Sequence, residues 1–372
     1  MEMTVTPVTL VIAGGGTGGH LYPGLAVARE LLRRRPAARV SFIGTAQGLE
    51  ARVVPREGFE LDVIRSAGIK GKSLAARLRG ASLVPVGLVE AWRTIARRRP
   101  DVVMGVGGYS SGPVVLAAAL RRVPTLVLEQ NAMPGLTNRL LARWVGAAAV
   151  TYAETLSYFG RRGFVTGNPV RREFFDRSEF EVRRSNFPQV LVLGGSQGAH
   201  AINVAMVAAA PRLVRRQADV TLVHQTGERD LAATRDAYER EGVRVRTEPF
   251  LDDVAAEMAA ADLVISRAGA TTLAELAAAG RAVVLVPFPG ATDDHQRRNA
   301  DLLANAGAAV VLDQRDLTPE RLADVLAELL GDDGRRGRMV EAIRGFARPD
   351  AAARIVDRIL ELAERPDSRA TR

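Results

Sequence analysis

The sequence predicts an α/β protein of two doubly wound parallel-sheet domains in tandem. Residues 8–13 and 190–193 are short apolar runs, and each run precedes a glycine cluster and then a helical pattern. Apolar runs of this length are typical of strands that are buried on both faces of a parallel sheet. The length of 372 residues is sufficient for two domains with separate cores.

Further strand and helix patterns alternate after each of these two starts. In the first half we expect strands at residues 8–13, 39–43, 102–104, 125–128 and 148–150, with a helix over about 22–35. In the second half we expect strands at 190–193, 220–224, 263–266 and 283–286, with a helix over about 201–216. Strands that alternate with helices predict a doubly wound, Rossmann-like sheet in each half.

The boundary between the halves is expected at residues 166–169 (TGNP), where turn residues precede a proline. The sequence thus predicts a first domain over residues 1–166 and a second over 167–345, facing each other across a cleft. A last amphipathic helix over about 346–365 is expected to pack back on the first domain.

Charge is unevenly distributed between the halves. Residues 1–166 contain 22 Lys and Arg against 10 Asp and Glu, whereas residues 167–372 contain 29 against 32, which together give the net charge of +9. A basic first half favours an anionic partner, which could be a nucleic acid, a phosphorylated substrate or an acidic membrane surface. Nucleic acid is disfavoured because no basic stripe is interleaved with aromatic residues.

Composition also excludes several classes of site. Cysteine is absent, which excludes disulfides and thiolate metal sites. The uncharged stretch 102–120 contains several Gly and Ser residues and a Pro, and is therefore a poor membrane span. The N-terminus lacks a basic region of the kind that begins a signal peptide. We expect a cytosolic protein, at most peripheral to a membrane.

The first glycine cluster fits a phosphate site better than a dinucleotide site. Gly14, Gly16 and Gly19 match the G-x-G-x-x-G pattern between a strand and a helix. A dinucleotide site also needs an acidic residue at the end of the second strand, and residues 40–45 (VSFIGT) contain none. A dehydrogenase is therefore disfavoured, while backbone N–H groups at a helix N-terminus remain suited to phosphate.

An ordered set of motifs resembles the MurG family of UDP-N-acetylglucosamine (UDP-GlcNAc) transferases. The motifs are residues 15–20 (GGTGGH) with Pro23, 107–113 (GGYSSGP), 129–131 (EQN) with 135–138 (GLTN), 167–171 (GNPVR), 194–199 (GGSQGA) and 267–270 (RAGA) through Glu275. The resemblance extends from about residue 8 to 312. It departs at Ala268, where Ser is common, and at Leu128, where His is common.

The resemblance implies a GT-B fold and an inverting transfer of GlcNAc. The acceptor would be the muramoyl C4 hydroxyl of undecaprenyl-pyrophosphoryl-MurNAc-pentapeptide (lipid I), and the products lipid II and UDP, in peptidoglycan synthesis. It also implies peripheral attachment to the cytoplasmic face of the cell membrane, with no cofactor beyond the UDP-GlcNAc substrate. The nearest alternative is a diacylglycerol glycosyltransferase; a UDP-GlcNAc 2-epimerase and a non-catalytic UDP-sugar-binding scaffold are further alternatives.

The resemblance assigns donor contacts mostly to the second half. They are Arg171, Ser196, Leu251, Arg267, Ala270, Thr271, Thr272, Leu273, Ala274, Glu275 and Gln296, together with Thr17, Gly18, Gly19 and Asn131 of the first half. The alternative role for Thr17, Gly18 and Gly19 is to cradle the acceptor pyrophosphate. A helix N-terminus after residues 263–266 would favour the charge of the leaving diphosphate. Glu275 would accept the ribose hydroxyls, although a first-turn Glu can also simply favour the helix dipole. No D-x-D occurs, and we expect no bound metal.

The base that takes the acceptor proton is expected in the first half. His20 follows the glycine loop, where a helix N-terminus favours a neutral imidazole that can accept a proton. Glu129, at the end of a strand, is the competing candidate. Gly16, Tyr109 and Asn138 resemble acceptor-binding residues of the family, and Asn131 shares their rim.

A cationic and apolar stretch is the candidate membrane surface. Residues 69–79 (IKGKSLAARLR) mix cations with Leu and Ile, and Leu83, Val84, Val86 and Leu88 follow. Such a surface can rest on an anionic bilayer, where each cation contributes about 1 kcal/mol.

Overall fold

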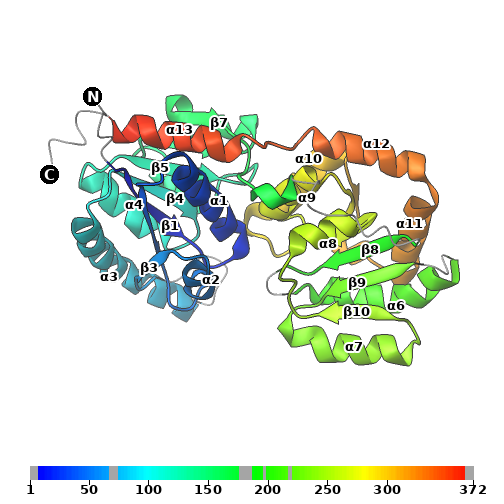
Figure 1. Cartoon of the computed structure of the whole chain (residues 1–372). Helices are drawn as coiled ribbons and strands as arrows, with labels where there is room; N and C mark the ends of the chain where they lie inside the picture. Colours follow the sequence, from blue (N-terminus) through cyan, green and yellow to red (C-terminus); the bar gives the residue numbers. More distant parts are fainter. Residues whose placement is uncertain (1–6, 67–73, 176–186, 196–197, 217–219, 365–372) are drawn as a thin grey trace. The chain divides into compact units, whose positions relative to one another are not determined.

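Two α/β units make up the chain, each built around its own sheet (Figure 1). The structure, a computed structural model, describes residues 7–66, 74–175, 187–195, 198–216 and 220–364, without the side chains of 74–82 and Thr292. The first unit comprises Met1–Arg171 and Arg348–Arg372, and the second comprises Arg172–Ala347.

The sheet of the first unit has seven parallel strands in the order β3-β2-β1-β4-β5-β6-β7. The strands are β1 (Thr9–Gly14), β2 (Arg39–Gly44), β3 (Glu60–Val63), β4 (Val102–Gly107), β5 (Thr125–Glu129), β6 (Ala147–Val150) and β7 (Gly163–Val165). The strand order reverses between β1 and β4, and ligands of such sheets bind at this point, beyond the carboxyl ends of the strands.

Helices cover both faces of this sheet because β1 and β4 are apolar on both sides. On one face, α1 (Gly18–Arg34) and α13 (Ala351–Ala363) pack on Leu10 and Ile12. On the other face, α3 (Leu74–Arg98) and α4 (Ser111–Leu120) pack on Val11 and Ala13. Two short helices, α2 (Glu50–Arg56) and α5 (Leu136–Leu141), lie in connections between strands.

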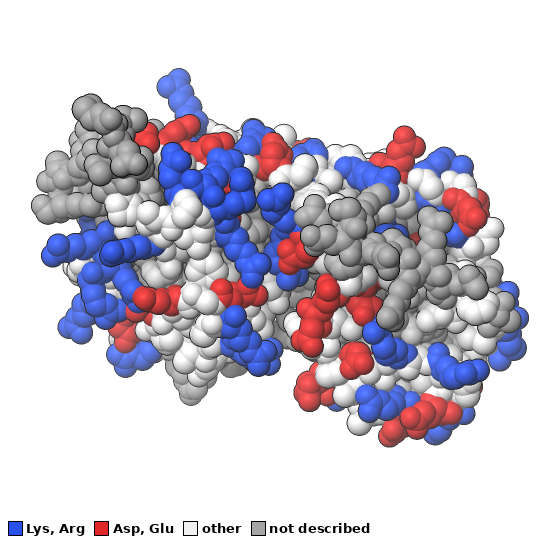
Figure 2. All heavy atoms as spheres, viewed as in Figure 1, with Lys and Arg blue, Asp and Glu red and all other residues white. Residues whose placement is uncertain are grey.

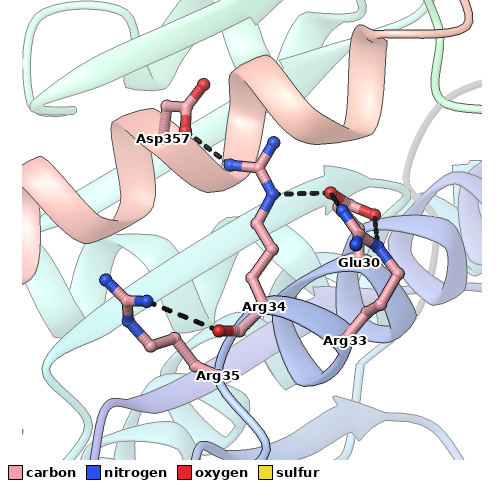
Figure 3. A network of polar contacts seen from close by, with 5 residues as sticks. All are labelled: Glu30, Arg33, Arg34, Arg35 and Asp357. Atoms are coloured by element: carbon pink, nitrogen blue, oxygen red, sulfur yellow. Dashed lines mark hydrogen bonds and ion pairs between the residues drawn. The ribbon is translucent and has the colours of Figure 1, made fainter.

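The last helix, α13, lies beside α1 although more than 300 residues separate their sequences (Figure 1). Its residues Ile355, Ile359 and Leu362 are buried in the same core as α1. At the surface, Arg34 donates to Asp357 at 2.5 Å and to Glu30 at 2.6 Å (Figure 3). The apolar contacts hold the helix, because exposed ion pairs contribute little.

The second unit repeats this plan with six parallel strands in the order β10-β9-β8-β11-β12-β13. The strands are β8 (Gln189–Leu193), β9 (Thr221–Gln225), β10 (Val245–Glu248), β11 (Leu263–Ser266), β12 (Ala282–Leu285) and β13 (Val310–Val311). The helices are α6 (His200–Arg216), α7 (Leu231–Arg240), α8 (Val254–Ala260), α9 (Ala270–Ala279), α10 (His295–Asn305), α11 (Pro319–Gly331) and α12 (Asp333–Arg344). Here the order reverses between β8 and β11.

The predicted fold class, two doubly wound parallel-sheet domains, is confirmed. All nine strands expected from the sequence are present, whereas β3, β7, β10 and β13 were not expected. These four strands are short and carry few fully buried side chains, so they lack the continuous apolar run of a central strand. Helix α1 begins at Gly18, earlier than expected, because the glycine loop passes directly into it.

Candidate functional site

Three loops of the first unit meet at the switch point of its sheet. They follow β1, β4 and β5, and the first two are in backbone contact. A Cβ at Gly14 would lie 2.5 Å from the carbonyl oxygen of Gly107, and a Cβ at Gly108 would lie 2.6 Å from that of Gly15. Only glycine permits the two loops to approach this closely. The close contact between the loops therefore explains the glycines in both motifs.

His20 stands at the junction of these two loops. It lies in the first turn of α1 and is half-buried, with its Nδ1 3.3 Å from the hydroxyl oxygen of Thr17. The opposite edge of its ring lies against Gly107, where a Cβ would come within 2.6 Å of Cδ2 and 3.0 Å of Nε2. If Thr17 donates to Nδ1, the proton of the neutral ring is on Nε2; the reverse arrangement leaves Nε2 able to accept a proton.

Other sequence-predicted residues gather around His20. Gly16 has a φ of +85°, and the Tyr109 ring lies over it at about the distance of an ordinary van der Waals contact from a Cβ. Tyr109 as a whole residue is 37% exposed. Thr17 and Gly19 are exposed and Gly18 is half-buried, at the N-terminus of α1. The structure therefore brings the GGTGGH and GGYSSGP motifs together.

Glu129 is buried at the end of β5, with only 2% of its surface exposed. Its Oε1 accepts from the backbone and side-chain N–H groups of Asn131, and its Oε2 accepts from Gly135 N–H and Asn138 Nδ2. Burial raises the pKa of Glu129, and the hydrogen bonds oppose that shift. The carboxylate thus holds the loop from Asn131 to Asn138 in one shape.

Glu50 was not predicted from the sequence as a site residue, yet its side chain reaches the first glycine loop. It begins α2 and is 1% exposed, and its Oε2 accepts from Gly16 N–H at 2.6 Å. The sequence signal for Glu50 was the presence of Gly44 and Gly48 close to it. The structure explains both glycines, because a Cβ at either position would collide with the Glu50 side chain. Two glycines near a glutamate do not by themselves predict a site residue, because the contact with Gly16 is visible only in the structure.

The glycine loop of the second unit rests on a buried polar network. Asn203 Nδ2 donates to the carbonyl oxygen of Thr226 at 2.9 Å and its Oδ1 lies 3.0 Å from His224 Nε2. The Nδ1 of His224 lies 2.8 Å from the Tyr238 hydroxyl. Gln225 Nε2 donates to the carbonyl oxygen of Gly195. Ser196, expected as a donor contact, lies outside the described residues.

The expected donor loop of the second unit joins β11 to α9. Arg267 turns inward: it donates to the carbonyl oxygens of Val286 and Pro287 and to Gln314, and its guanidinium lies 5.4 Å from the Phe288 ring centroid. Burial lowers its pKa to about 10, which leaves it charged. The predicted residues that follow form the start of α9: Ala270, Thr271, Thr272, Leu273, Ala274 and the half-buried Glu275.

Helix α10 is tied to the same region. Gln296 Oε1 accepts from the backbone N–H of Phe288 at 3.0 Å, and the buried Asn299 donates to the carbonyl oxygen of Ala268 at 3.4 Å. Leu251 is buried in the loop after β10. Arg171, expected as a donor contact, belongs to the first unit, where its guanidinium lies 4.7 Å from the Tyr22 ring centroid.

The described residues contain neither a cluster of metal ligands nor a membrane-spanning helix. Among those residues there is no group of three or more His, Asp or Glu side chains that could hold a metal ion. In the same residues, no helix combines the length and the apolar character needed to cross a membrane.

Known proteins resemble the chain over most of its length. Residues 10–150 match the N-terminal domain, and residues 189–355 the C-terminal domain, of glycosyltransferase family 28. A UDP-N-acetylglucosamine–N-acetylmuramyl-(pentapeptide) pyrophosphoryl-undecaprenol N-acetylglucosamine transferase from Pelobacter propionicus is 48% identical, covering 94% of this chain and 98% of its own. The transferase of the same name from Anaeromyxobacter sp. (strain K) is 46% identical, and the match covers 96% of this chain and 93% of that protein. The crystal structure of Acinetobacter baumannii MurG matches with a TM-score of 0.74 and 31% sequence identity, and the match covers 95% of this chain and 100% of that chain.

Proposed function

The chain belongs to glycosyltransferase family 28, within the group of transferases named above, and we propose that it moves GlcNAc from UDP-GlcNAc to lipid I. The hydroxyl oxygen at C4 of the muramoyl sugar forms a bond to the anomeric carbon of GlcNAc. The bond from that carbon to the β-phosphate oxygen breaks, and UDP leaves with the electron pair. The proton of the attacking hydroxyl passes to a base. The products are lipid II and UDP, and the process belongs to peptidoglycan synthesis.

One observation carries this proposal: identity of 48% to such a transferase extends over 94% of the chain. It therefore includes both units and the loops at both switch points. A diacylglycerol acceptor is not favoured, because the relatives named above carry lipid-pyrophosphoryl muramoyl pentapeptide in their names.

We propose that α9 receives the diphosphate of the donor. Its N-terminus follows Gly269, and the N–H groups and dipole of a helix N-terminus favour the negative charge that develops on leaving UDP. Glu275 would hold the ribose hydroxyls and Gln296 the sugar, while the half-buried Arg267 would hold the loop that precedes α9. In this proposal the N-terminus of α9 stabilises the leaving group, and turnover needs no bound divalent ion.

We propose His20 as the base and Glu129 as the residue that orients the acceptor loop. His20 lies at the junction of two glycine loops and is half-buried, so a substrate hydroxyl can reach it. Glu129 is enclosed and accepts four hydrogen bonds from its own loop. Proton transfer at Glu129 would require the loop from Asn131 to Asn138 to open. Tyr109, Asn138 and Gly16 would then form the acceptor rim.

We further propose that the first unit binds the cytoplasmic face of an anionic membrane. Apolar side chains are exposed on α3, at Val84, Val89 and Trp92, and around α5, at Leu136, Leu140 and Trp144. Arg121 lies over the Trp92 ring. In Figure 2, Lys and Arg prevail on the visible face of this unit, with Asp and Glu among them, whereas the two kinds are more evenly mixed on the second unit. Residues 69–73 of the expected surface, and the side chains of residues 74–79, lie outside the described part of the structure.

The decisive experiment is an assay of the purified chain with radiolabelled UDP-GlcNAc and a short-chain lipid I analogue in EDTA. Labelled disaccharide lipid is expected, and it would support both the acceptor and the independence from metal. UDP-GlcNAc binding without product, in EDTA and in Mg²⁺, would contradict the acceptor assignment and direct the next assay to diacylglycerol.

The base is tested by His20→Ala beside Glu129→Ala. Loss of a general base is expected to lower kcat by about a hundredfold to ten-thousandfold. The same His20 change should leave UDP affinity unaltered, because UDP binds the other unit in this proposal. A His20→Ala enzyme with wild-type kcat would exclude His20 as the base.

The membrane proposal is tested by sedimentation with vesicles of anionic and of neutral lipids. Trp144→Ser and Trp92→Ser are expected to reduce binding to anionic vesicles, and Phe187→Ser, an exposed aromatic of the second unit, serves as the control. Equal binding of all four proteins to anionic vesicles would contradict this surface.

A further inference from the structure

Glu50 uses its two carboxylate oxygens separately, and each holds a different segment of backbone. Oε2 accepts from the Gly16 N–H at 2.6 Å. Oε1 accepts from the Thr45 N–H at 2.8 Å and from the Thr45 hydroxyl at 2.9 Å. The side chain is 1% exposed. The carboxylate therefore connects the loop after β1 to the loop after β2.

The surrounding backbone is shaped to contain this carboxylate. A Cβ at Gly15, Gly44 or Gly48 would lie 2.3, 2.4 or 2.1 Å from an atom of the Glu50 side chain. Three glycines thus surround one buried acid. Gly15 also has a φ of +141°, which L side chains rarely adopt, so the loop follows a path that glycine permits and Glu50 fixes.

The segment that Glu50 holds leads directly to the residues proposed to act on the acceptor. Gly16 lies beneath the Tyr109 ring, and Gly15 contacts Gly108 through its carbonyl oxygen. His20 follows in the first turn of α1. A shift of Gly15 and Gly16 would therefore move His20 and Tyr109 relative to one another.

We propose that Glu50 is a positioning residue, which holds the first glycine loop in the shape that receives the acceptor. The inference rests on the proposed function for the identity of that ligand. Glu50 does not touch substrate, because its side chain is buried and both oxygens are bonded to the protein. Residues of this kind determine how accurately a site is preorganised, and a displacement of about 1 Å can lower a rate about a hundredfold.

The test is Glu50→Gln in the full chain. Glutamine keeps the size of the side chain but has one acceptor oxygen, and its NH2 group would face a backbone N–H at Gly16 or at Thr45. One of the two connections is therefore lost. Glu57→Gln is the matched control, because Glu57 follows α2 and bonds to the Arg29 side chain at the surface.

We expect kcat/KM for the lipid I analogue to fall about tenfold to a hundredfold in Glu50→Gln, with UDP affinity unchanged. A general loss of folded protein would instead lower the active fraction and leave the acceptor KM as it was. Wild-type kcat/KM in Glu50→Gln, or a loss equal to that of Glu57→Gln, would overturn the proposal.

A second variant and a second readout keep the inference independent of folding and of the proposed function. Gly48→Ala retains the acid but pushes its carboxylate aside, so it should reproduce the Glu50→Gln phenotype. Hydrogen exchange of the Gly16 amide needs no substrate, and it should be faster in both variants than in the wild type. Unchanged exchange would overturn the inference even if the wild type proved inactive on lipid I, whereas faster exchange in that case would support it.

Discussion

His224 is expected to make the stability of the second unit depend on pH. The ring is fully buried and lies between Asn203 and Tyr238. The Oδ1 of Asn203 can only accept, so Nε2 carries the proton and Nδ1 accepts from the Tyr238 hydroxyl. Burial lowers the pKa of His224 to about 3, from an ordinary value of 6.5. The folded state thus holds a neutral imidazole, and the unfolded state takes up a proton first as the pH falls.

The magnitude follows from the difference between the two pKa values. Above pH 6.5 both states are neutral at this residue, and His224 adds no pH dependence. Below pH 6.5 the unfolded state gains about 1.4 kcal/mol per pH unit, until the folded state is protonated near pH 3. Between pH 7.5 and pH 5, the second unit should therefore lose about 2 kcal/mol through this group, which corresponds to a decrease in Tm of about 4–8 °C.

The assay is scanning calorimetry of the full chain beside His224→Gln. Both tryptophans, Trp92 and Trp144, belong to the first unit, so tryptophan fluorescence identifies its transition and the other transition belongs to the second. Carboxyl groups titrate in both proteins alike, and the difference between them isolates His224. The variant should be less stable at pH 7.5, by about 1–3 kcal/mol for the lost hydrogen bonds, and the gap should close by about 2 kcal/mol at pH 5. A gap independent of pH would refute the neutral buried imidazole.

Three further outcomes test other parts of the structure. Glu129→Gln should lower kcat/KM for the acceptor about tenfold to a hundredfold, because a glutamine NH2 cannot accept from its loop; wild-type kinetics would contradict this role. Gly198→Ala would place a Cβ 2.3 Å from the Thr226 carbonyl oxygen and should weaken UDP binding at least about tenfold, measured by calorimetry. Gly242→Ala, where no atom lies within 4 Å, is the control with a similar positive φ. Asp357→Asn should cost less than about 1 kcal/mol of unfolding free energy, whereas Ile359→Ala should cost about 2–5 kcal/mol; the reverse order would show that ion pairs hold α13.

The central strands could be predicted from the sequence because burial on both faces leaves a continuous apolar run. The edge strands could not, because a strand such as β3, with Glu60 and Asp62, presents polar side chains to solvent and is set by pairing with β2. The motifs likewise indicated loops that lie together, since Gly16 lies beneath the Tyr109 ring and Gly107 lies against the His20 ring. The sequence could not show that Glu129 is enclosed, because its donors Gly135 and Asn138 lie beyond β5, immediately before α5 and within it.

A dinucleotide site needs an acidic residue at the end of its second strand, and this chain has none there. An acid a few residues further on, Glu50, takes a different structural role. In a dinucleotide site that acid points outward to a ribose. In this chain Glu50 begins the helix after β2 and points inward to the Gly16 N–H, 34 positions back along the chain. The second unit uses the same topological place, because Gln225 ends β9 and donates to the carbonyl oxygen of Gly195 in the loop after β8. In each unit, a side chain at the end of the second strand or just beyond it thus holds the glycine loop that follows the first strand of the same unit. Side chains at the place that binds a ribose in a dehydrogenase therefore hold the glycine loop instead. This arrangement suits glycine loops that bind phosphate groups without a dinucleotide.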